Sequence, residues 1–289
     1  MKAIIQTGYN KTQIKEMPSI PLSPISIKVK TNFVPLLRYD LLKLNGQVPT
    51  KLPSILGYGA TGTVVAIGNL RSSSLLNKRV LILNQWGTFQ EKITSNIPPL
   101  TIPILDNVSN EEATGLIGGA DLALSLFKIV KNTFKQIIIY GADSVTGLVL
   151  MQLLTRFTKV PFIPKARTLS ANYLKQKINE YNIKPDIEAT AQKNNLIIDL
   201  VGSAINDKLY QHIQNNDEVI SVAQNDLFGV KFISKPALPK DYSFLMNEIS
   251  NNRLFIPINQ IFNYKNFNEA IEYQTTSPSR GRNLIFFKD

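Results

Sequence analysis

The sequence predicts two domains, a mostly antiparallel β domain and a doubly wound α/β domain with a parallel sheet. The first hundred residues carry short β-like runs broken by proline and glycine. Strand and helix patterns alternate from Gln136 onward, and this alternation ends near Ser243. A chain of 289 residues with 44% hydrophobic content can bury a large core and divide in two. We place the β domain at residues 1–108, completed by 244–289, and the α/β domain at 109–243.

The predicted β domain rests on runs in which apolar and β-branched residues recur between turn residues. These runs are MKAIIQT, ISIKVKTNFV, GTVVAIG, KRVLILN and FQEKITS. A proline-rich passage, Pro98 to Pro103, then leads to Asn110, which can cap a helix running to Val130. The tail has a helix-like stretch, Phe267 to Tyr273, and a last strand, NLIFFK.

The predicted α/β domain follows from alternation of β-branched runs with longer amphipathic or apolar stretches. In order, these are strand IIIYGA, a helix to Phe157, strand VPFIP, helix Ser170 to Tyr181, strand LIIDLVG, helix Asn206 to Asn215, strand EVISVA and strand VKFI. The link Ile187 to Asn195 is too short for a crossover helix with its turns, so we expect one trimmed sheet face there.

The turn after the first of these strands has the layout of a nucleotide-binding βαβ unit. In such a unit a pyrophosphate approaches backbone N–H groups at a helix N-terminus, which ordinarily needs three glycines. Those places read Ala142, Ser144 and Gly147. Ser144 can replace glycine if its φ stays negative and its hydroxyl donates to a phosphate oxygen, and Thr146 can act similarly. Asp143 adds a carboxylate where a phosphate would lie, unless its side chain turns outward.

The end of the second strand bears on which dinucleotide would bind. It reads Lys165-Ala-Arg167, with no acid where an NAD enzyme would hold the ribose hydroxyls. Two cations suit a 2′-phosphate, although a solvated basic loop is the alternative interpretation. We therefore predict NADP(H) as the cofactor, if one binds. The predicted cofactor-binding residues are Ala142, Ser144, Val145, Thr146, Gly147, Lys165 and Arg167.

Composition limits the remaining chemistry. The absence of cysteine excludes disulfides, thiolate catalysis and zinc sites built on Cys, and the single histidine leaves little for other zinc designs, so we expect no metal. The histidine, His212, is expected at the surface or a helix end, and Asp199 at a strand end.

The net charge of +11 could attract nucleic acid, an anionic membrane or a phosphorylated ligand. The lysines are scattered without an Arg/Lys block, so the charge assigns no partner by itself. No apolar run approaches the roughly 18 to 20 residues needed to span a bilayer, and the apolar stretch at the start is too short for a signal peptide. We expect a cytoplasmic chain without membrane partners.

Six segments in a fixed order carry a resemblance over nearly the whole chain. They are MKAIIQTGY, LPSILGYGATGTVVAIG, GTFQEKIT, IIIYGADSVTG, IIDLVGS and FNEAIEYQTTSPSRGRNLIFF. With them the sequence resembles zinc-free medium-chain dehydrogenases/reductases of the quinone oxidoreductase type. The resemblance implies a GroES-like β domain interrupted by a Rossmann domain. It also implies a homodimer formed at a Rossmann edge strand, for which Val230 to Ile233 is the candidate.

The chain departs from this family at several positions. Where members with catalytic zinc place Cys, His and Glu, this chain reads LRYD from Leu37 to Asp40 and GYGATG from Gly57. Zinc-free members commonly carry Asn at the position of Leu37 and Tyr near Val48, and both are apolar here. Asp40 is retained. The candidate catalytic residues are Asp40, Tyr58, Arg38 and Tyr39.

Two functions stay open from the sequence. In the first, a nicotinamide supplies hydride, and a Tyr O–H or Arg stabilises the oxyanion that develops on the acceptor. The resemblance then implies an NADPH-dependent, zinc-independent oxidoreductase acting on a small quinone, enone or related carbonyl. In the second, favoured by Leu37, Val48, Asp143 and Ser144, the chain is catalytically silent and binds a partner, with RNA as one candidate. Tyr39 and Tyr58 would then be half-buried aromatics, and Arg38 would pair with Asp40 or solvent.

Overall fold

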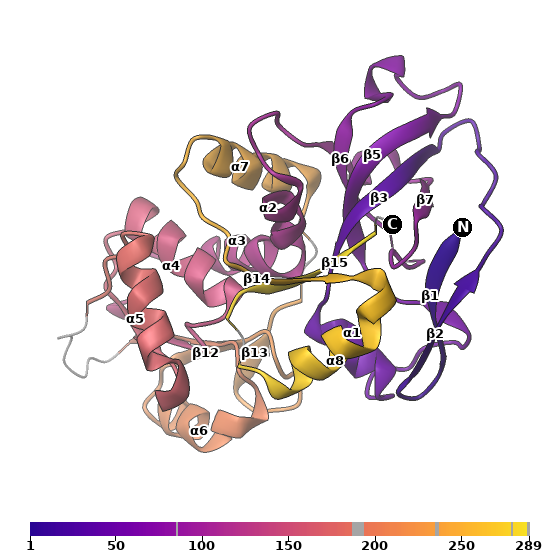
Figure 1. The fold of residues 1–289 in the computed structure, drawn as a ribbon. Helices are drawn as coiled ribbons and strands as arrows, with labels where there is room; N and C mark the ends of the chain where they lie inside the picture. The colour runs from indigo at the N-terminus through magenta and orange to yellow at the C-terminus, as the bar shows by residue number, and fades with distance from the viewer. Residues whose placement is uncertain (85, 187–193, 235–236, 279, 288–289) are drawn as a thin grey trace. The chain divides into compact units, whose positions relative to one another are not determined.

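The computed structural model describes residues 1–289 except 85, 187–193, 235–236, 279 and 288–289 (Figure 1). These residues form two compact units. The first comprises Met1–Gly118, Pro239–Arg253 and Ile258–Asp289, and the second comprises Gly119–Leu238 and Leu254–Pro257. Our domain limits at residues 108 and 244 stay predictions. No helix in the described ranges is long and apolar enough to cross a membrane.

The first unit is built on antiparallel strands, as predicted. Within the described residues, one sheet has the order β14-β15-β3-β5-β6-β8 with β7 also on β3, and a smaller one has the order β2-β1-β4. Only the pair β14 and β15 is parallel. The strands are β1 Lys2–Gly8, β2 Lys11–Glu16, β3 Ile27–Pro35, β4 Ser54–Ile55, β5 Gly59–Ile67, β6 Arg79–Leu83, β7 Lys92–Ser95, β8 Thr101–Pro103, β14 Ile258–Asn263 and β15 Arg282–Phe286.

In the described part of this unit the sheets are accompanied by the α-helices α1 Arg38–Leu44, α2 Asn110–Gly115, α7 Pro239–Ser250 and α8 Phe267–Thr276. The core gathers residues from both ends of the chain, because Ile27 and Phe89 are buried together with Phe267 and Ile285. The ring of Phe89 meets that of Phe267 edge to face with centroids 5.0 Å apart. The C-terminal segment therefore completes the core of the first unit.

The prediction of one helix from Asn110 to Val130 is wrong, because the structure has two helices with a break between them. Helix α2 begins at a capping box, in which Ser109 Oγ accepts from the N–H of Glu112, and ends at Gly115. The chain then leaves helical geometry, since Gly118 has φ of +64°. A second helix, α3, runs from Asp121 to Phe127. Gly118 allows this break because its missing Cβ permits left-handed backbone.

The second unit has the predicted parallel, doubly wound sheet. Its described strands have the order β10-β9-β11-β12-β13, and all pairs are parallel. They are β9 Gln136–Tyr140, β10 Phe162–Lys165, β11 Asn195–Asp199, β12 Glu218–Ser221 and β13 Val230–Phe232, and the helices besides α3 are α4 Val145–Phe157, α5 Ala171–Glu180 and α6 Asn206–Gln214. The short link predicted at Ile187 to Asn195 falls largely outside the described residues.

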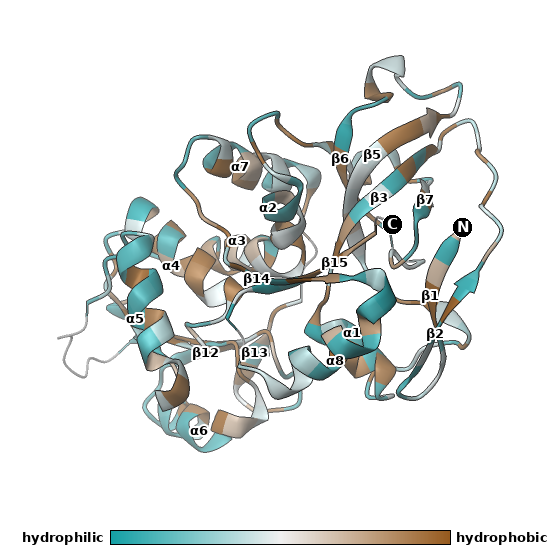
Figure 2. Ribbon diagram, viewed as in Figure 1, coloured by the Kyte–Doolittle hydropathy of each residue, from teal (hydrophilic) through white to brown (hydrophobic). Residues whose placement is uncertain are grey.

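The helices of the second unit differ in how deeply they are buried. In α4 every residue from Val145 to Leu154 is buried, whereas in α5 only Leu174 is, and α5 is accordingly mostly hydrophilic in Figure 2. Helix α3 packs against α4. Helix α4 is thus a buried helix of the second unit, and it begins at the turn after β9.

Candidate functional site

The carboxyl ends of the parallel strands in the second unit meet at one edge, where α/β proteins bind ligands. Main-chain bonds join the loops there: the N–H groups of Gly141 and Ala142 both donate to the carbonyl of Lys165, at 3.0 and 3.1 Å. The N–H of Leu200 donates to the carbonyl of Tyr140 at 3.1 Å. The residues predicted to bind a cofactor from the turn and from the end of β10 are therefore brought together.

Ser144 meets the condition that we set for replacing a glycine. Its φ is −76°, and it is the N-cap of α4, with its Oγ accepting from the N–H of Gly147 at 3.1 Å. Because this bond uses an oxygen lone pair, the hydroxyl proton remains to donate to a ligand. The left-handed residue of the turn is Gly141, with φ of +79°. Sequence reasoning missed Gly141, although a glycine directly after a β-branched run was the signal.

Gly147 holds α4 close to the turn. A Cβ at this position would meet the Cα, oxygen and carbonyl carbon of Ala142 at 2.7 to 2.8 Å. These are backbone atoms of a fully buried residue, so they have little room to move. A glycine at this position therefore lets the start of α4 pack directly on the backbone of Ala142.

We therefore expect Gly147→Ala to lower the free energy of unfolding by about 2 to 3 kcal/mol through overpacking. Urea unfolding followed by circular dichroism measures this change. Gly8→Ala is the matched control, because a Cβ there meets only side-chain atoms of Lys11 at 3.6 and 3.8 Å. Equal stability losses in the two variants would contradict the packing argument.

Most other predicted turn residues are shielded. Ala142, Val145 and Thr146 are all buried, so a ligand at this edge would meet chiefly backbone N–H groups and the Ser144 hydroxyl. Asp143 is only 7% exposed, which means that its side chain does not turn outward into solvent. It forms no hydrogen bond with any residue the structure describes. Its negative charge lies beside the N-terminus of α4, where the helix dipole favours it.

The segment from the end of β10 to the start of α5 carries two basic side chains and a serine hydroxyl without a described hydrogen-bond partner. Lys165 ends β10 and Arg167 precedes a short 3-10 turn, and both are exposed. Ser170, directly before α5, is 0% exposed, and its Oγ has no hydrogen-bond partner in the described part of the chain. An unpaired buried hydroxyl is costly and calls for an acceptor. The sequence predicted Ser170 only as the start of a helix.

Asp199, the last residue of β11, ties together two loops at the same edge. Its Oδ1 accepts from the N–H groups of Val201 and Gly202, at 2.8 and 2.9 Å. Its Oδ2 accepts from Ser221 Oγ at 2.7 Å and from the side-chain amide of Gln224 at 3.3 Å. The carboxylate is completely buried. Asp199 thus fixes the loops after β11 and β12, in agreement with its expected place at a strand end.

His212 lies in the last turn of α6, as expected for a residue at a helix end, but it is also part of a hydrogen-bond chain. Its Nδ1 lies 2.8 Å from Asp217 Oδ2, and its Nε2 lies 3.1 Å from the hydroxyl of Tyr140. Burial raises the pKa of Tyr140 above its usual value, so this tyrosine stays neutral. The chain joins α6 to the end of β9.

In the first unit, Asp40 is 1% exposed and forms a capping interaction at the start of α1. Its Oδ2 accepts from the N–H of Leu37 at 2.9 Å, and its Oδ1 accepts from the N–H of Gly57 at 3.1 Å. Burial raises the pKa of Asp40 to about 6, against the opposing effects of these two bonds and of Lys43 and Arg282. The carboxylate therefore joins the two segments in which the family resemblance placed its departures.

The other candidate catalytic residues of the first unit are sequence neighbours of Asp40 or of Gly57, and their side chains differ in exposure. Arg38 and Tyr39 are exposed, with Tyr39 at 44%, and the ammonium of Lys43 lies 4.7 Å from the Tyr39 ring centroid. Tyr58 is half-buried. Leu37 is buried and packs so closely on Gly118 that a Cβ there would meet Leu37 Cδ2 at 2.9 Å. No described group of three or more His, Cys, Asp or Glu could hold a metal ion.

Known proteins share this architecture. The chain superimposes on the quinone oxidoreductase from Coxiella burnetii with a TM-score of 0.82 and 19% identity, over 100% of this chain and 99% of that one. It also superimposes on a mycobacterial protein solved in complex with NADPH, with a TM-score of 0.79 and 16% identity over 99% and 100% of the two chains. The chain shares the fold of these two proteins. The predicted fold class is thereby confirmed.

Comparison of the sequence with known sequences matches a smaller part of the chain than comparison of the structures does. No known family profile matches the chain. The synaptic vesicle membrane protein VAT-1 homolog of Rattus norvegicus is 30% identical over 121 residues, which cover 38% of this chain and only 28% of that protein. The full extent of the fold is therefore matched by the solved structures alone, and the sequence match covers only a part of the chain.

Proposed function

We propose that the chain is an NADP(H)-dependent, zinc-independent oxidoreductase that transfers hydride to a quinone, an enone or a related carbonyl. The observation that carries the proposal is the turn from Gly141 to Gly147. Although two expected glycines are replaced, Ser144 keeps a negative φ and caps α4, and Gly147 keeps the close packing. The shared quinone oxidoreductase fold and the NADPH-bound mycobacterial structure add support.

The residues at the carboxyl edge of the second unit fit an NADP dinucleotide. The first N–H groups of α4 and the Ser144 hydroxyl would hold the pyrophosphate. Lys165 and Arg167, which are both exposed, would neutralise a 2′-phosphate. Bound NADPH would supply the hydride, since the protein's part is binding and orientation.

In the first unit, we assign polarisation of the substrate carbonyl to a side-chain donor near α1. Tyr39, Arg38 and Tyr58 carry suitable O–H or N–H groups. Asp40 acts as a positioning residue, because both of its oxygens already accept from backbone N–H groups and it is almost completely buried. We also propose a homodimer through the edge strand β13, whose Lys231 and Phe232 are exposed.

One observation favours the alternative, a catalytically silent chain that binds a partner such as RNA. The carboxylate of Asp143 is buried in the phosphate turn without a described hydrogen-bond partner. A unit charge about 4 Å from a phosphate opposes binding by about 1 to 4 kcal/mol in wet surroundings. Cofactor titration decides between the two functions.

The test is titration of the protein with NADPH and with NADH, followed by nicotinamide fluorescence and by thermal shift. We expect micromolar binding of NADPH and weaker binding of NADH. The single tryptophan, Trp86, offers a second optical signal. Absence of binding of both cofactors at millimolar concentration would overturn the oxidoreductase proposal.

We expect the double variant Lys165→Gln, Arg167→Gln to weaken NADPH binding about a hundredfold and to leave NADH binding nearly unchanged. Each lost charge-assisted contact to a phosphate contributes about 1.4 kcal/mol, a factor of ten. The control is Lys15→Gln, Lys175→Gln, which removes two exposed charges elsewhere. An equal loss for NADPH and NADH would contradict a 2′-phosphate contact.

A further inference from the structure

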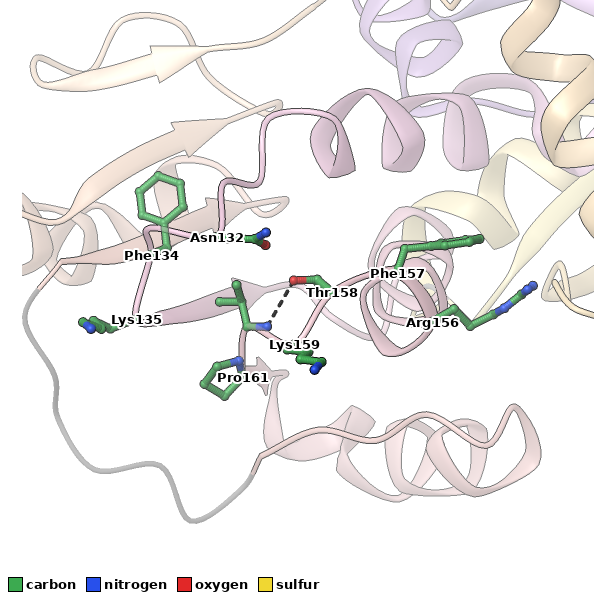
Figure 3. A pocket seen from close by; sticks show the side chains of 9 residues that line it. Asn132, Phe134, Lys135, Arg156, Phe157, Thr158, Lys159 and Pro161 are labelled. Carbon is green, nitrogen blue, oxygen red and sulfur yellow. Dashed lines mark hydrogen bonds between the residues drawn. The ribbon is translucent and has the colours of Figure 1, made fainter.

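A pocket of about 630 Å³ lies at the amino-terminal edge of the sheet in the second unit (Figure 3). Its walls come from the loop before β9, residues 132–135, and from the end of α4 with the loop into β10, residues 156–161. The turn at Gly141 lies at the other end of β9, about 16 Å away for a strand of this length. The pocket is therefore separate from the proposed cofactor site.

The pocket lies in a strongly cationic part of the chain. Residues 122–179 contain nine Lys or Arg and a single acidic residue, Asp143. Lys135, Arg156 and Lys159 line the pocket, and no carboxylate does. Lys135 and Lys159 are exposed and form no ion pair with any residue the structure describes. Three cations around one concavity favour an anionic ligand.

The two ends of the pocket differ in character. Figure 3 shows Lys135 and Phe134 at one end and Arg156 with Phe157 at the other, with Asn132, Thr158 and Lys159 between them. The Arg156 guanidinium lies 4.9 Å from the centroid of the Phe157 ring, which is 45% exposed. A guanidinium paired with a phenyl ring is a platform for a planar, electron-rich group.

The polarity of α4 orients the ligand. The carbonyl end of the helix carries partial negative charge, and Arg156 in its last turn offsets that charge. A phosphate is therefore better placed toward Lys135 and Lys159 than against the helix end. Thr158 Oγ accepts from the N–H of Val160 at 3.1 Å, which fixes the loop that carries Lys159.

We propose that this pocket binds an aromatic organic phosphate, the chemistry that a nucleotide provides. Its phosphate lies on the side of Lys135 and Lys159, and its ring lies on the side of Arg156 and Phe157. The cavity volume falls within the roughly 300 to 1,000 Å³ of small-molecule sites. The proposal does not depend on the oxidoreductase function, since it uses none of the residues assigned to the dinucleotide.

The test uses N-methylanthraniloyl-ADP as a fluorescent probe and 8-azido-ADP as a photo-crosslinker. We expect the double variant Lys135→Gln, Lys159→Gln to weaken probe binding at least tenfold, and crosslinks in wild type to include residues 132–135 or 156–161. Lys15→Gln, Lys175→Gln is the charge-matched control and should bind as wild type does. All replaced lysines are exposed, so melting temperatures near that of wild type are expected and confirm folding.

Three results would overturn the proposal. The first is probe affinity unchanged by Lys135→Gln, Lys159→Gln, with crosslinks confined to residues 141–170, which would place the nucleotide at the carboxyl edge alone. The second is displacement by inorganic pyrophosphate as effective as that by ADP, which would remove the role of the ring. The third is displacement by a short oligoribonucleotide at a concentration far below that of ADP, which would make the pocket part of a nucleic-acid surface.

Discussion

Replacing Asp143 by Asn is expected to tighten NADPH binding by about fivefold or more. Asp143 is 7% exposed in the turn that would hold the pyrophosphate, and its carboxylate has no hydrogen bond with the described residues. Removing a negative charge about 4 Å from a phosphate recovers about 1 to 4 kcal/mol, and 1.4 kcal/mol is a factor of ten in affinity. Isothermal titration calorimetry of wild type and Asp143→Asn with NADPH measures the difference.

The control for this gain is Asp207→Asn. Asp207 also carries a negative charge at the start of a helix, in the first turn of α6, and it is exposed. The Asp207→Asn variant should leave NADPH affinity unchanged. Like Asp143→Asn, it should lose the favourable interaction of a carboxylate with the helix dipole, about 0.5 kcal/mol of stability. NADPH affinity that stays constant or falls in Asp143→Asn would show that the carboxylate does not oppose the phosphate.

The second large effect concerns stability and pH. Because burial raises the pKa of Asp40 from 3.8 to about 6, the folded state binds this proton more tightly than the unfolded chain does. The stability contributed by protonated Asp40 is fully present below pH 3.8 and is lost as pH rises through about 6. Between pH 4 and 7 the loss attributable to this group is about 2 kcal/mol.

We expect Asp40→Asn to flatten this pH dependence relative to wild type. Urea unfolding at pH 4, 5, 6 and 7 gives the free energy of unfolding, and the difference between the two proteins isolates Asp40 from other carboxyl groups. Asn has one carbonyl oxygen for the N–H groups of Leu37 and Gly57, so a pH-independent loss accompanies the change. Exposed Asp106→Asn is the control and should keep the wild-type slope. Parallel curves for wild type and Asp40→Asn would refute the raised pKa.

The helix after Ser109 shows where a local pattern was insufficient. Asn110 and the apolar residues that follow favour one helix to Val130, and a helix does begin at Asn110, although its cap is Ser109 and not Asn110. The break lies at Gly118, where Leu37, far away in sequence, occupies the space that a Cβ would need. A contact between distant residues leaves no trace in the periodicity of either segment.

The sequence by itself determined the alternation of β-branched runs and helices, and with it the parallel sheet and the turn at Ser144. These features are local, since residue type, capping and spacing act within one element or one turn. Only the tertiary structure decided that Ser170 is buried with an unused hydroxyl, that Asp40 caps α1 beside Gly57, and that Lys135 and Lys159 line one pocket. Burial and proximity between distant segments are set by packing, and packing also determines which polar groups are left to bind a ligand.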